Sequence, residues 1–359
     1  MTDRRTFLTA LALAPGAAAF ARQHTPMRRT SMHLVYTSFA VRMLQGRDIM
    51  KTTAATLGAD TFRDLCARFG ASGGQIDYSQ LPQGPDALAA VRAAFKESRV
   101  ELEVSIPSRF LESPEAYAQA VTVARALGAT RARVALLSGR RYESFDTKAA
   151  WDAFTDKWRT TLVRMRLEFD RHALDIGIEN HKDWLAPELA ALLRAIDSPH
   201  VGACVDFGNN LALLEDPDET IDVLAPYAVT THVKDMAVRT SPDGFELSEV
   251  PLGEGLLPLE RYVAAIRRAR PNARLCLEMI TRDPLRVPYR TDRYWVPFET
   301  GARDAARIRQ FETRVLSRAW TRELPRITGL GAEAQIAAED DNVRTSCTYA
   351  RDVLKLEAD

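Results

Sequence analysis

The chain has 359 residues, of which 46% are hydrophobic and 27% are charged, as in an ordinary globular protein. Lysine plus arginine and aspartate plus glutamate each total 48, so the formal net charge is zero. A zero net charge provides no bulk attraction to nucleic acid or to an anionic membrane, and we expect neither as a partner. Length alone does not divide the chain, because α/β barrels of about 250 residues form single domains.

The N-terminus has the pattern of an export signal. The pair Arg4-Arg5 precedes an apolar stretch from Leu8 to Phe20, and Ala19-Phe20-Ala21 supplies the small residues of a cleavage site. A twin arginine is typical of the bacterial pathway that exports folded proteins, and the stretch is too short for a membrane span. We therefore expect residues 1–21 to be a signal peptide. The mature chain, from about Arg22, is then periplasmic or otherwise exported.

Strand-like and helix-like segments alternate regularly along the middle of the chain. Short β-branched or aliphatic runs predict eight strands: His33–Ala40, Gly74–Ser79, Val100–Ile106, Ala132–Leu137, Asp175–Asn180, Val201–Asp206, Val229–Val233 and Arg274–Met279. Amphipathic stretches predict the helices between them: Ala59–Phe69, Pro85–Lys96, Glu115–Leu127, Lys148–Arg171, Pro187–Ile196, Pro217–Leu224 and Leu259–Arg270. Eight such units without a linker-like break predict an α/β fold, a (β/α)₈ TIM barrel, over residues 30–300.

The end of the chain differs from this pattern. Thr281–Thr300 is rich in proline and aromatic residues and is expected to be a loop. Two helical segments are expected beyond it, Arg303–Ala319 and Asn342–Leu356. We interpret residues 301–359 as a C-terminal helical extension packed on the barrel.

The four cysteines are expected to be structural. Their spacing matches no zinc or redox motif. Two of them, Cys204 and Cys276, fall within predicted core strands, where a free cysteine behaves as a small hydrophobe. We expect no disulfide on which the structure depends.

Four polar side chains recur at the ends of four successive predicted strands. They are Glu179 in IGIENH, Asp206 in VGACVDFGN, His232 in VTTHVKD and Glu278 in RLCLEMI. In each strand the large aliphatic residues have the opposite parity, so the four candidates are expected to point into the barrel near its C-terminal end. Carboxylates and an imidazole that converge in this way predict a divalent-metal site.

These segments resemble the sugar phosphate isomerase/epimerase family of xylose isomerase-like barrels, over most of residues 33–300. The resemblance also rests on the Asp-x-Gly-Asn of CVDFGNN, on HVKD at His232–Asp235 and on LGEG at Leu252–Gly255. In epimerases of this family a Glu, an Asp, a His and a second Glu bind Mn²⁺, Co²⁺ or Mg²⁺. The two Glu residues also act there as an acid/base pair.

The resemblance implies that Glu179, Asp206, His232 and Glu278 bind a divalent metal. Mn²⁺ is favoured over Co²⁺, Mg²⁺ and Zn²⁺. It also implies that Glu179 and Glu278 are catalytic.

Other polar residues near these strand ends are candidates for the same site. His181 shares the parity of Glu179 and is predicted to be a general base or a substrate contact. The chain departs from keto-sugar epimerases at Asn209, where those enzymes have a histidine shortly after the Asp ligand, and this departure alters the substrate grip. The predicted substrate-binding residues are Asn209, Lys234, Lys182, Glu254 and Arg282.

The sequence therefore predicts a metal-dependent isomerase or epimerase that removes a proton next to a carbonyl of a sugar or sugar derivative. A lyase that cleaves 3-keto-glycosides by β-elimination remains an alternative, because it begins with the same proton abstraction. A barrel that binds sugar without catalysis is also left open, as is a homo-oligomer. Phosphodiester cleavage is disfavoured, because that branch of the family needs many histidines and this chain has six.

Overall fold

The computed structural model describes residues 27–44 and 57–358 of the chain. The predicted signal peptide, residues 1–21, lies outside the described residues. Within those residues, no helix has both the length and the apolar character needed to cross a membrane. All four cysteines are buried and free.

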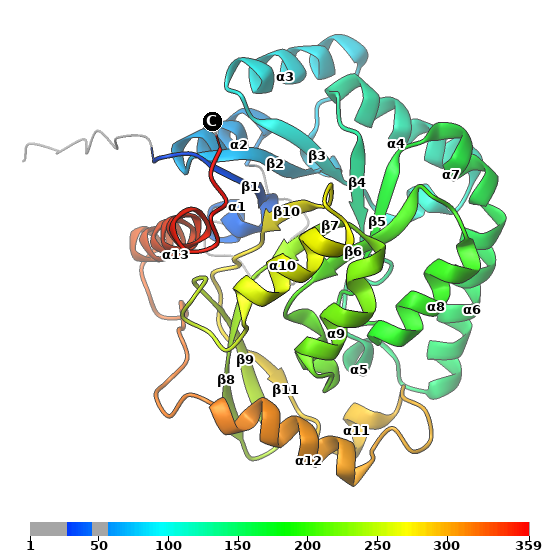
Figure 1. Cartoon of the computed structure of the whole chain (residues 1–359), viewed down its shortest axis with the longest axis vertical. Helices are drawn as coiled ribbons and strands as arrows, with labels where there is room; N and C mark the ends of the chain where they lie inside the picture. Colours follow the sequence, from blue (N-terminus) through cyan, green and yellow to red (C-terminus); the bar gives the residue numbers. More distant parts are fainter. Residues whose placement is uncertain (1–26, 45–56, 359) are drawn as a thin grey trace, which may run out of the picture.

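Eight parallel strands close into a barrel, which confirms the predicted TIM barrel (Figure 1). The strands follow one another around the barrel in chain order, and β10 closes it against β1. They are β1 (Thr30–Val35), β2 (Ala71–Asp77), β3 (Glu101–Ser105), β4 (Arg131–Val134), β5 (Asp175–Glu179), β6 (Val201–Asp206), β7 (Ala228–Val233) and β10 (Arg274–Leu277). Because all eight run in parallel, their carboxyl ends meet at one rim.

Helices cover the outside of the barrel and bury their apolar faces against it. They are α2 (Ala59–Arg68), α3 (Pro85–Glu97), α4 (Pro114–Leu127), α6 (Lys148–Arg164), α7 (Arg166–His172), α8 (Ala186–Ile196), α9 (Pro217–Leu224) and α10 (Leu259–Ala269). Their ends follow local rules. In α4, the Ser113 side chain accepts from the Ala116 amide, and Gly128 ends the helix in the left-handed conformation.

The first predicted strand, His33–Ala40, is wrong in its second half. The strand ends at Val35, and a 3₁₀ turn, η1 (Tyr36–Phe39), and a short helix, α1 (Ala40–Leu44), follow. The Ser38 hydroxyl in this turn donates to the Leu277 carbonyl and accepts from the Met279 amide, both at 3.1 Å. These contacts with the strand that closes the barrel outweigh the local strand propensity.

A small antiparallel sheet was not predicted. It consists of β8 (Asp235–Ser241), β9 (Gly244–Val250) and β11 (Leu285–Val287). Strands β8 and β9 form a hairpin whose two turn residues are Pro242 and Asp243, and Gly244 follows them as the first residue of β9. Proline, aspartate and glycine in this order are a sequence signal for a tight turn. The third strand, β11, falls in the region predicted to be a loop.

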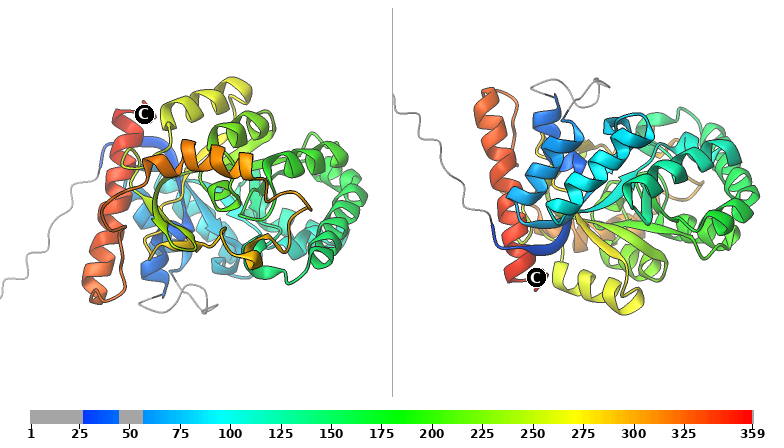
Figure 2. Two further views of the ribbon diagram at one scale, coloured as in Figure 1. Left: turned by 90° about the horizontal axis from the view of Figure 1, so that it is seen from below. Right: turned by 90° about the horizontal axis from the view of Figure 1, so that it is seen from above.

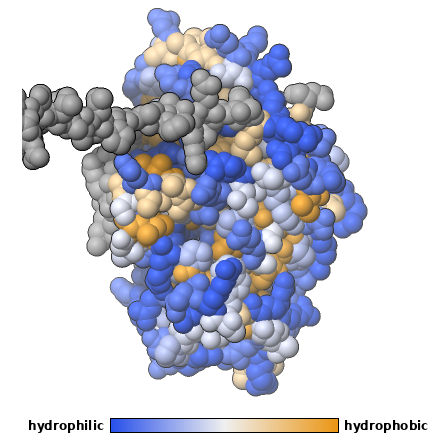
Figure 3. All heavy atoms as spheres, turned by 90° about the vertical axis from the view of Figure 1, so that its left-hand side faces the viewer, coloured by the Kyte–Doolittle hydropathy of each residue, from blue (hydrophilic) through white to orange (hydrophobic). Residues whose placement is uncertain are grey.

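The C-terminal segment is helical, as predicted, but its boundaries differ. It contains α12 (Ala305–Arg314) and α13 (Ala332–Asp352), whereas the short helix α11 (Asp292–Trp295) falls in the segment Thr281–Thr300 that was predicted to be a loop. The last helix begins ten residues before the predicted start at Asn342, because its polar first half gives little apolar periodicity. Figure 2 shows α13 beside β1 and α1, and the face that carries it is largely hydrophilic (Figure 3).

The region between β4 and β5 contains three helices. The predicted helix Lys148–Arg171 is two helices, α6 and α7, with Met165 between them. A short helix, α5 (Arg141–Ser144), lies between β4 and α6.

Candidate metal centre and active site

The four predicted metal ligands come together at the carboxyl ends of the strands. Glu179, Asp206, His232 and Glu278 each offer a ligand atom, and these atoms lie within 4.8 Å of one another. We call these four residues the donor cluster. All four are buried, and they come from β5, β6, β7 and the end of β10, which are neighbours around the barrel. The alternating direction of strand side chains therefore produces the convergence that the sequence predicted.

One nitrogen of His232 faces the three carboxylates of the donor cluster. Its Nδ1 lies 3.3 Å from Glu179 Oε1, 3.5 Å from Glu278 Oε2 and 3.7 Å from Asp206 Oδ2. It is buried and has no hydrogen-bond partner among the described residues. An imidazole nitrogen among three carboxylate oxygens is a donor set that suits Mn²⁺, Co²⁺, Zn²⁺ or Mg²⁺. The residues present therefore fit a divalent cation.

The other nitrogen of His232 is held by a buried polar chain. Nε2 lies 2.9 Å from Gln75 Oε1, and the Gln75 amide donates to Glu103 Oε1 at 2.6 Å. The second oxygen of Glu103 accepts from Thr230 Oγ1 at 3.0 Å. Gln75 thus presents its oxygen to His232, so Nε2 carries the proton and the Nδ1 lone pair faces the carboxylates. Sequence reasoning missed this chain, although Gln75 and Glu103 are polar residues within otherwise buried strands.

Cations hold the carboxylates of the donor cluster in place. Arg133 on β4 forms an ion pair with Glu179 and donates to Ser105 Oγ at 3.0 Å. Lys234 lies 2.8 Å from Asp206 Oδ2 and pairs with Glu278. Thr37 Oγ1 donates to Glu278 Oε1 at 2.8 Å. Arg133 was missed, although it shares the inward parity of a short strand.

These contacts determine the charge of the two glutamates. Burial would raise the pKa of Glu179, but Arg133 holds it well below its usual value. Burial would likewise raise the pKa of Glu278, but Lys234 holds it well below its usual value. Both glutamates are therefore ionised at neutral pH, as metal ligands and general bases must be.

His181 is held in one tautomer by the backbone. Its Nδ1 lies 2.9 Å from the Leu137 carbonyl oxygen. Because a carbonyl oxygen only accepts, Nδ1 carries the proton and Nε2 keeps its lone pair. Burial lowers the pKa of His181 to about 4, so the ring is neutral at pH 7. A neutral imidazole with a free lone pair can accept a proton.

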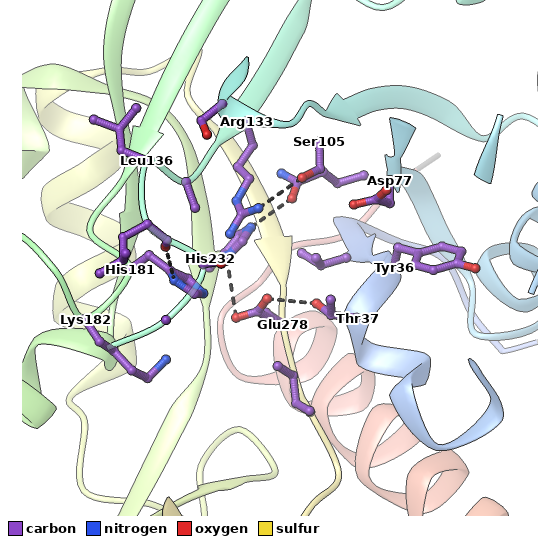
Figure 4. A pocket seen from close by; sticks show the side chains of 18 of the residues that line it. Tyr36, Thr37, Asp77, Ser105, Arg133, Leu136, His181, Lys182, His232 and Glu278 are labelled. Carbon is purple, nitrogen blue, oxygen red and sulfur yellow. Dashed lines mark hydrogen bonds and ion pairs between the residues drawn. The ribbon is translucent and has the colours of Figure 1, made fainter. Parts of the chain in front are cut away.

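A cavity of about 520 Å³ lies over the donor cluster (Figure 4). Its lining includes His232 and Glu278 of the donor cluster, together with Arg133. Three of the other predicted site residues also line it: His181, Lys182 and Arg282.

Two predicted substrate-binding residues lie behind the lining. Asn209 donates to Glu179 Oε1 at 3.0 Å and accepts from the Lys182 amine. Lys234 touches two carboxylates of the donor cluster and is buried. Both therefore hold residues of the site in position.

Glu254 lies apart from this group. It is exposed, in the loop between β9 and α10, and is not among the residues that line the cavity. The amides of Gly253, Gly255 and Leu257 in this loop donate to the Asp235 carboxylate, at 2.9 to 3.1 Å. The loop conformation thus directs backbone amides to the Asp235 carboxylate, and the exposed side chain of Glu254 faces outward.

Known proteins share this fold. The chain is 28% identical, over 263 residues, to the 3-oxo-isoapionate decarboxylase of Pectobacterium atrosepticum. The aligned residues make up 72% of this chain and 85% of that protein. A crystal structure of D-psicose 3-epimerase in the presence of D-fructose has a TM-score of 0.55 at 15% identity, covering 84% of this chain and 94% of the epimerase.

A second solved structure carries a metal. It is a xylose isomerase-like TIM barrel protein from Mycobacterium smegmatis in complex with magnesium, with a TM-score of 0.53 at 15% identity, covering 76% of this chain and 98% of that one. At 15% identity, the similarity to these two solved structures shows a shared fold and nothing further. The family model described as "Xylose isomerase-like TIM barrel" matches residues 54–308, more than two thirds of the chain. The chain therefore belongs to the family of xylose isomerase-like TIM barrels.

Proposed function

We propose that this protein is a divalent-metal-dependent isomerase or epimerase that moves a proton at the carbon beside a carbonyl of a sugar or sugar derivative. The observation that carries the proposal is the donor cluster, whose ligand atoms lie within 4.8 Å of one another beside the cavity. A cation bound there, with Mn²⁺ first and Co²⁺, Mg²⁺ or Zn²⁺ as alternatives, would supply Lewis-acid polarisation of the carbonyl.

The side chains supply the proton transfer. Glu179 and Glu278 are ionised, and they come from strands that β6 and β7 separate. Glu278 lines the cavity, and Glu179 lies next to it in the donor cluster. One carboxylate can therefore take a proton from the substrate and, as the carboxylic acid so formed, return it to the neighbouring carbon, which completes an isomerisation. An epimerisation requires the other glutamate first to take up a proton from solvent, which it then delivers to the opposite face of the carbon. General acid–base catalysis of this kind is typically worth about 10²–10⁴ in rate. His181, through Nε2, can take the proton of a substrate hydroxyl.

A lyase is the second candidate, and the relationship to a decarboxylase favours it. In the β-elimination of a 3-keto-glycoside, the carboxylate takes the proton next to the ketone. The C–O bond to the aglycone then breaks, and the electron pair leaves with the oxygen. In a decarboxylation, the C–C bond breaks and CO₂ leaves. The electron pair of the broken C–C bond stays on the carbon next to the polarised carbonyl until a side chain donates a proton to that carbon.

Metal analysis of the purified mature protein tests the proposal. We expect Glu179→Ala, Asp206→Ala, His232→Ala and Glu278→Ala each to lose most of the bound metal and all measurable turnover. Glu260→Ala is the matched control, because it removes an exposed carboxylate on α10. Full metal content in all four variants would contradict the site.

The reaction type follows from incubation of the metal-loaded protein in D₂O with ketoses, 3-keto-glucosides and keto acids. Deuterium incorporation without bond cleavage indicates an isomerase or epimerase. Release of the aglycone or of CO₂ indicates a lyase. A protein that binds sugar equally well before and after chelation, with no turnover on any metal, is a non-catalytic binder.

We also propose that the protein is exported through the twin-arginine pathway. The proposal is supported by the sequence of residues 1–21 alone. Fusion of residues 1–26 to a folded reporter should direct the reporter to the periplasm. Replacement of Arg4 and Arg5 by lysine should retain it in the cytoplasm, and equal export of both fusions would contradict the proposal.

A further inference from the structure

The cavity over the donor cluster has a cation whose charge is not matched. Lys182 follows β5, lines the cavity and is 6% exposed. Its amine donates to Asn209 Oδ1, which is a neutral acceptor. In the described ranges 27–44 and 57–358, no carboxylate forms an ion pair with this amine. Figure 4 shows Lys182 on the cavity wall, with its amine directed inward.

The other cations of the cavity wall are matched. Arg282 donates to Glu249 Oε1 at 2.9 Å. Arg140 pairs with Glu143 beside it. Neither guanidinium therefore needs a further anion, and Lys182 is distinct from both.

The backbone holds Lys182 in an uncommon conformation. Its φ is +64°, in the left-handed region that side chains other than glycine rarely adopt. The turn is fixed from both sides, because Asp183 Oδ1 accepts from the amides of His181 and Trp184, and the Arg141 amide donates to the Lys182 carbonyl. Backbone strain that the surrounding structure maintains is common at ligand sites. Here it places a buried amine at the cavity.

The charge balance then indicates the substrate. A bound dication, Arg133 and Lys234 carry four positive charges against three on the carboxylates of the donor cluster. Lys182 adds a fifth positive charge, and Asp77 on the lining removes one. Burial raises the pKa of the neighbouring Asp183 carboxyl group to about 7, so the loaded site keeps a surplus of at most one positive charge. Without a bound cation, burial, and then Lys234 and Arg282, lower the pKa of Lys182 to about 8, while Asp206 and Glu249 raise it.

We propose, building on the proposed function, that the substrate carries one carboxylate group and that Lys182 binds it. A neutral sugar would leave a buried ammonium unmatched, and burial of an unmatched charge is costly. A phosphate dianion would exceed the surplus. The substrate class is therefore a keto acid derived from a sugar, rather than a free ketose or a sugar phosphate.

Matched ligands test this assignment on the Mn²⁺-loaded protein. 2-Keto-D-gluconate is D-fructose with a carboxylate in place of the C1 hydroxymethyl group, and D-fructose 1-phosphate carries a dianion at the same end. In calorimetric titrations we expect the keto acid to bind about ten-fold or more tightly than fructose, and more tightly than the phosphate, because a charge-assisted hydrogen bond is gained.

Substitutions assign the preference to the amine. Lys182→Met should remove the preference for the keto acid and leave fructose binding within about two-fold. Lys182→Arg should retain much of the preference. The matched control is Lys157→Met, which removes an exposed ammonium on α6 and should change nothing. Metal content, measured in parallel, reports whether each variant folds.

The outcomes separate this inference from the proposed function. Equal affinity for keto acid and fructose, tighter binding of the phosphate, no binding of the keto acid, or an equal loss of all ligands in Lys182→Met would overturn the inference while the metal site stands. Failure of the wild-type protein to hold a divalent metal would overturn the proposed function. A carboxylate preference that persisted in the chelated protein would then support the role of Lys182 alone.

Discussion

The orientation of a single amide decides how His232 can act. Gln75 donates to Glu103, and this bond turns its oxygen toward His232 Nε2. The Nδ1 lone pair then faces the carboxylates of the donor cluster. A histidine without this partner would divide its population between two tautomers, and only one of them suits a metal ligand.

We predict that Gln75→Leu weakens divalent-metal binding by about 10–100-fold, the usual effect of removing a hydrogen bond to a metal-binding histidine. Competition with a fluorescent chelator measures the Mn²⁺ dissociation constant. Gln310→Leu, an exposed glutamine on α12, is the control and should bind Mn²⁺ as the wild type does. An unchanged dissociation constant in Gln75→Leu would show that another contact orients His232.

A second buried carboxyl group makes stability depend on pH. Glu215 accepts from the Ala186 amide at 2.8 Å and from the Asn210 side chain, and burial raises its pKa to about 7. Between its unfolded pKa of about 4.5 and this value, the native protein binds the proton that the unfolded chain has lost. The contribution of Glu215 to stability is therefore full below about pH 4.5 and falls as the pH rises toward 7.

We predict that Glu215→Gln removes this loss, which is at most about 3 kcal/mol, because glutamine keeps the acceptor oxygen and does not ionise. Urea denaturation at several pH values measures the difference. In Glu219→Gln, which changes an exposed carboxylate on α9, the pH profile should follow the wild type. A steep fall that persists in Glu215→Gln would assign the dependence to other groups.

At the scale of elements, α13 supports the turn that holds Glu278. This helix lies beyond residues 54–308, which the family model matches. Its Glu339 accepts from the Val41 amide at 2.6 Å and from Arg42 at 2.5 Å. The same turn carries Thr37, which donates to Glu278. The C-terminal extension thus supports α1, which directly follows the η1 turn that carries Thr37.

We predict that Glu339→Ala destabilises the protein by about 3 kcal/mol or more, because it leaves Arg42 and the Val41 amide without their buried acceptor. Asp341→Ala on the same helix removes an exposed carboxylate and should cost within about 0.5 kcal/mol. Denaturant titration of both variants provides the comparison. Equal costs would show that α13 does not hold the η1–α1 turn through Glu339.

For the whole molecule, stability should depend on the metal. The donor cluster gathers three buried carboxylates from three strands, and a dication that binds only the native state joins them. Binding of this kind stabilises by about 2.7 kcal/mol at a metal concentration one hundred times the dissociation constant.

We predict that chelation lowers the melting temperature by about 4 °C relative to Mn²⁺-saturated protein. Differential scanning fluorimetry measures the shift. In His232→Ala the shift should disappear, because the nitrogen donor is lost. A shift of the same size in that variant would place the stabilising metal elsewhere.

The sequence by itself determined the repeat of strand and helix and the inward direction of the four donor residues. Both follow from local periodicity, since side chains alternate along a strand and the carboxyl ends of parallel strands meet at one rim. Only the tertiary structure decided the length of the first strand, the partners of His232 and the role of Asn209. Ser38, Gln75 and Glu103 act through residues far away in sequence, and their partners become neighbours only when the barrel closes. The unmatched charge of Lys182 is also decided only by the tertiary structure, because it depends on which carboxylates the fold brings near the amine.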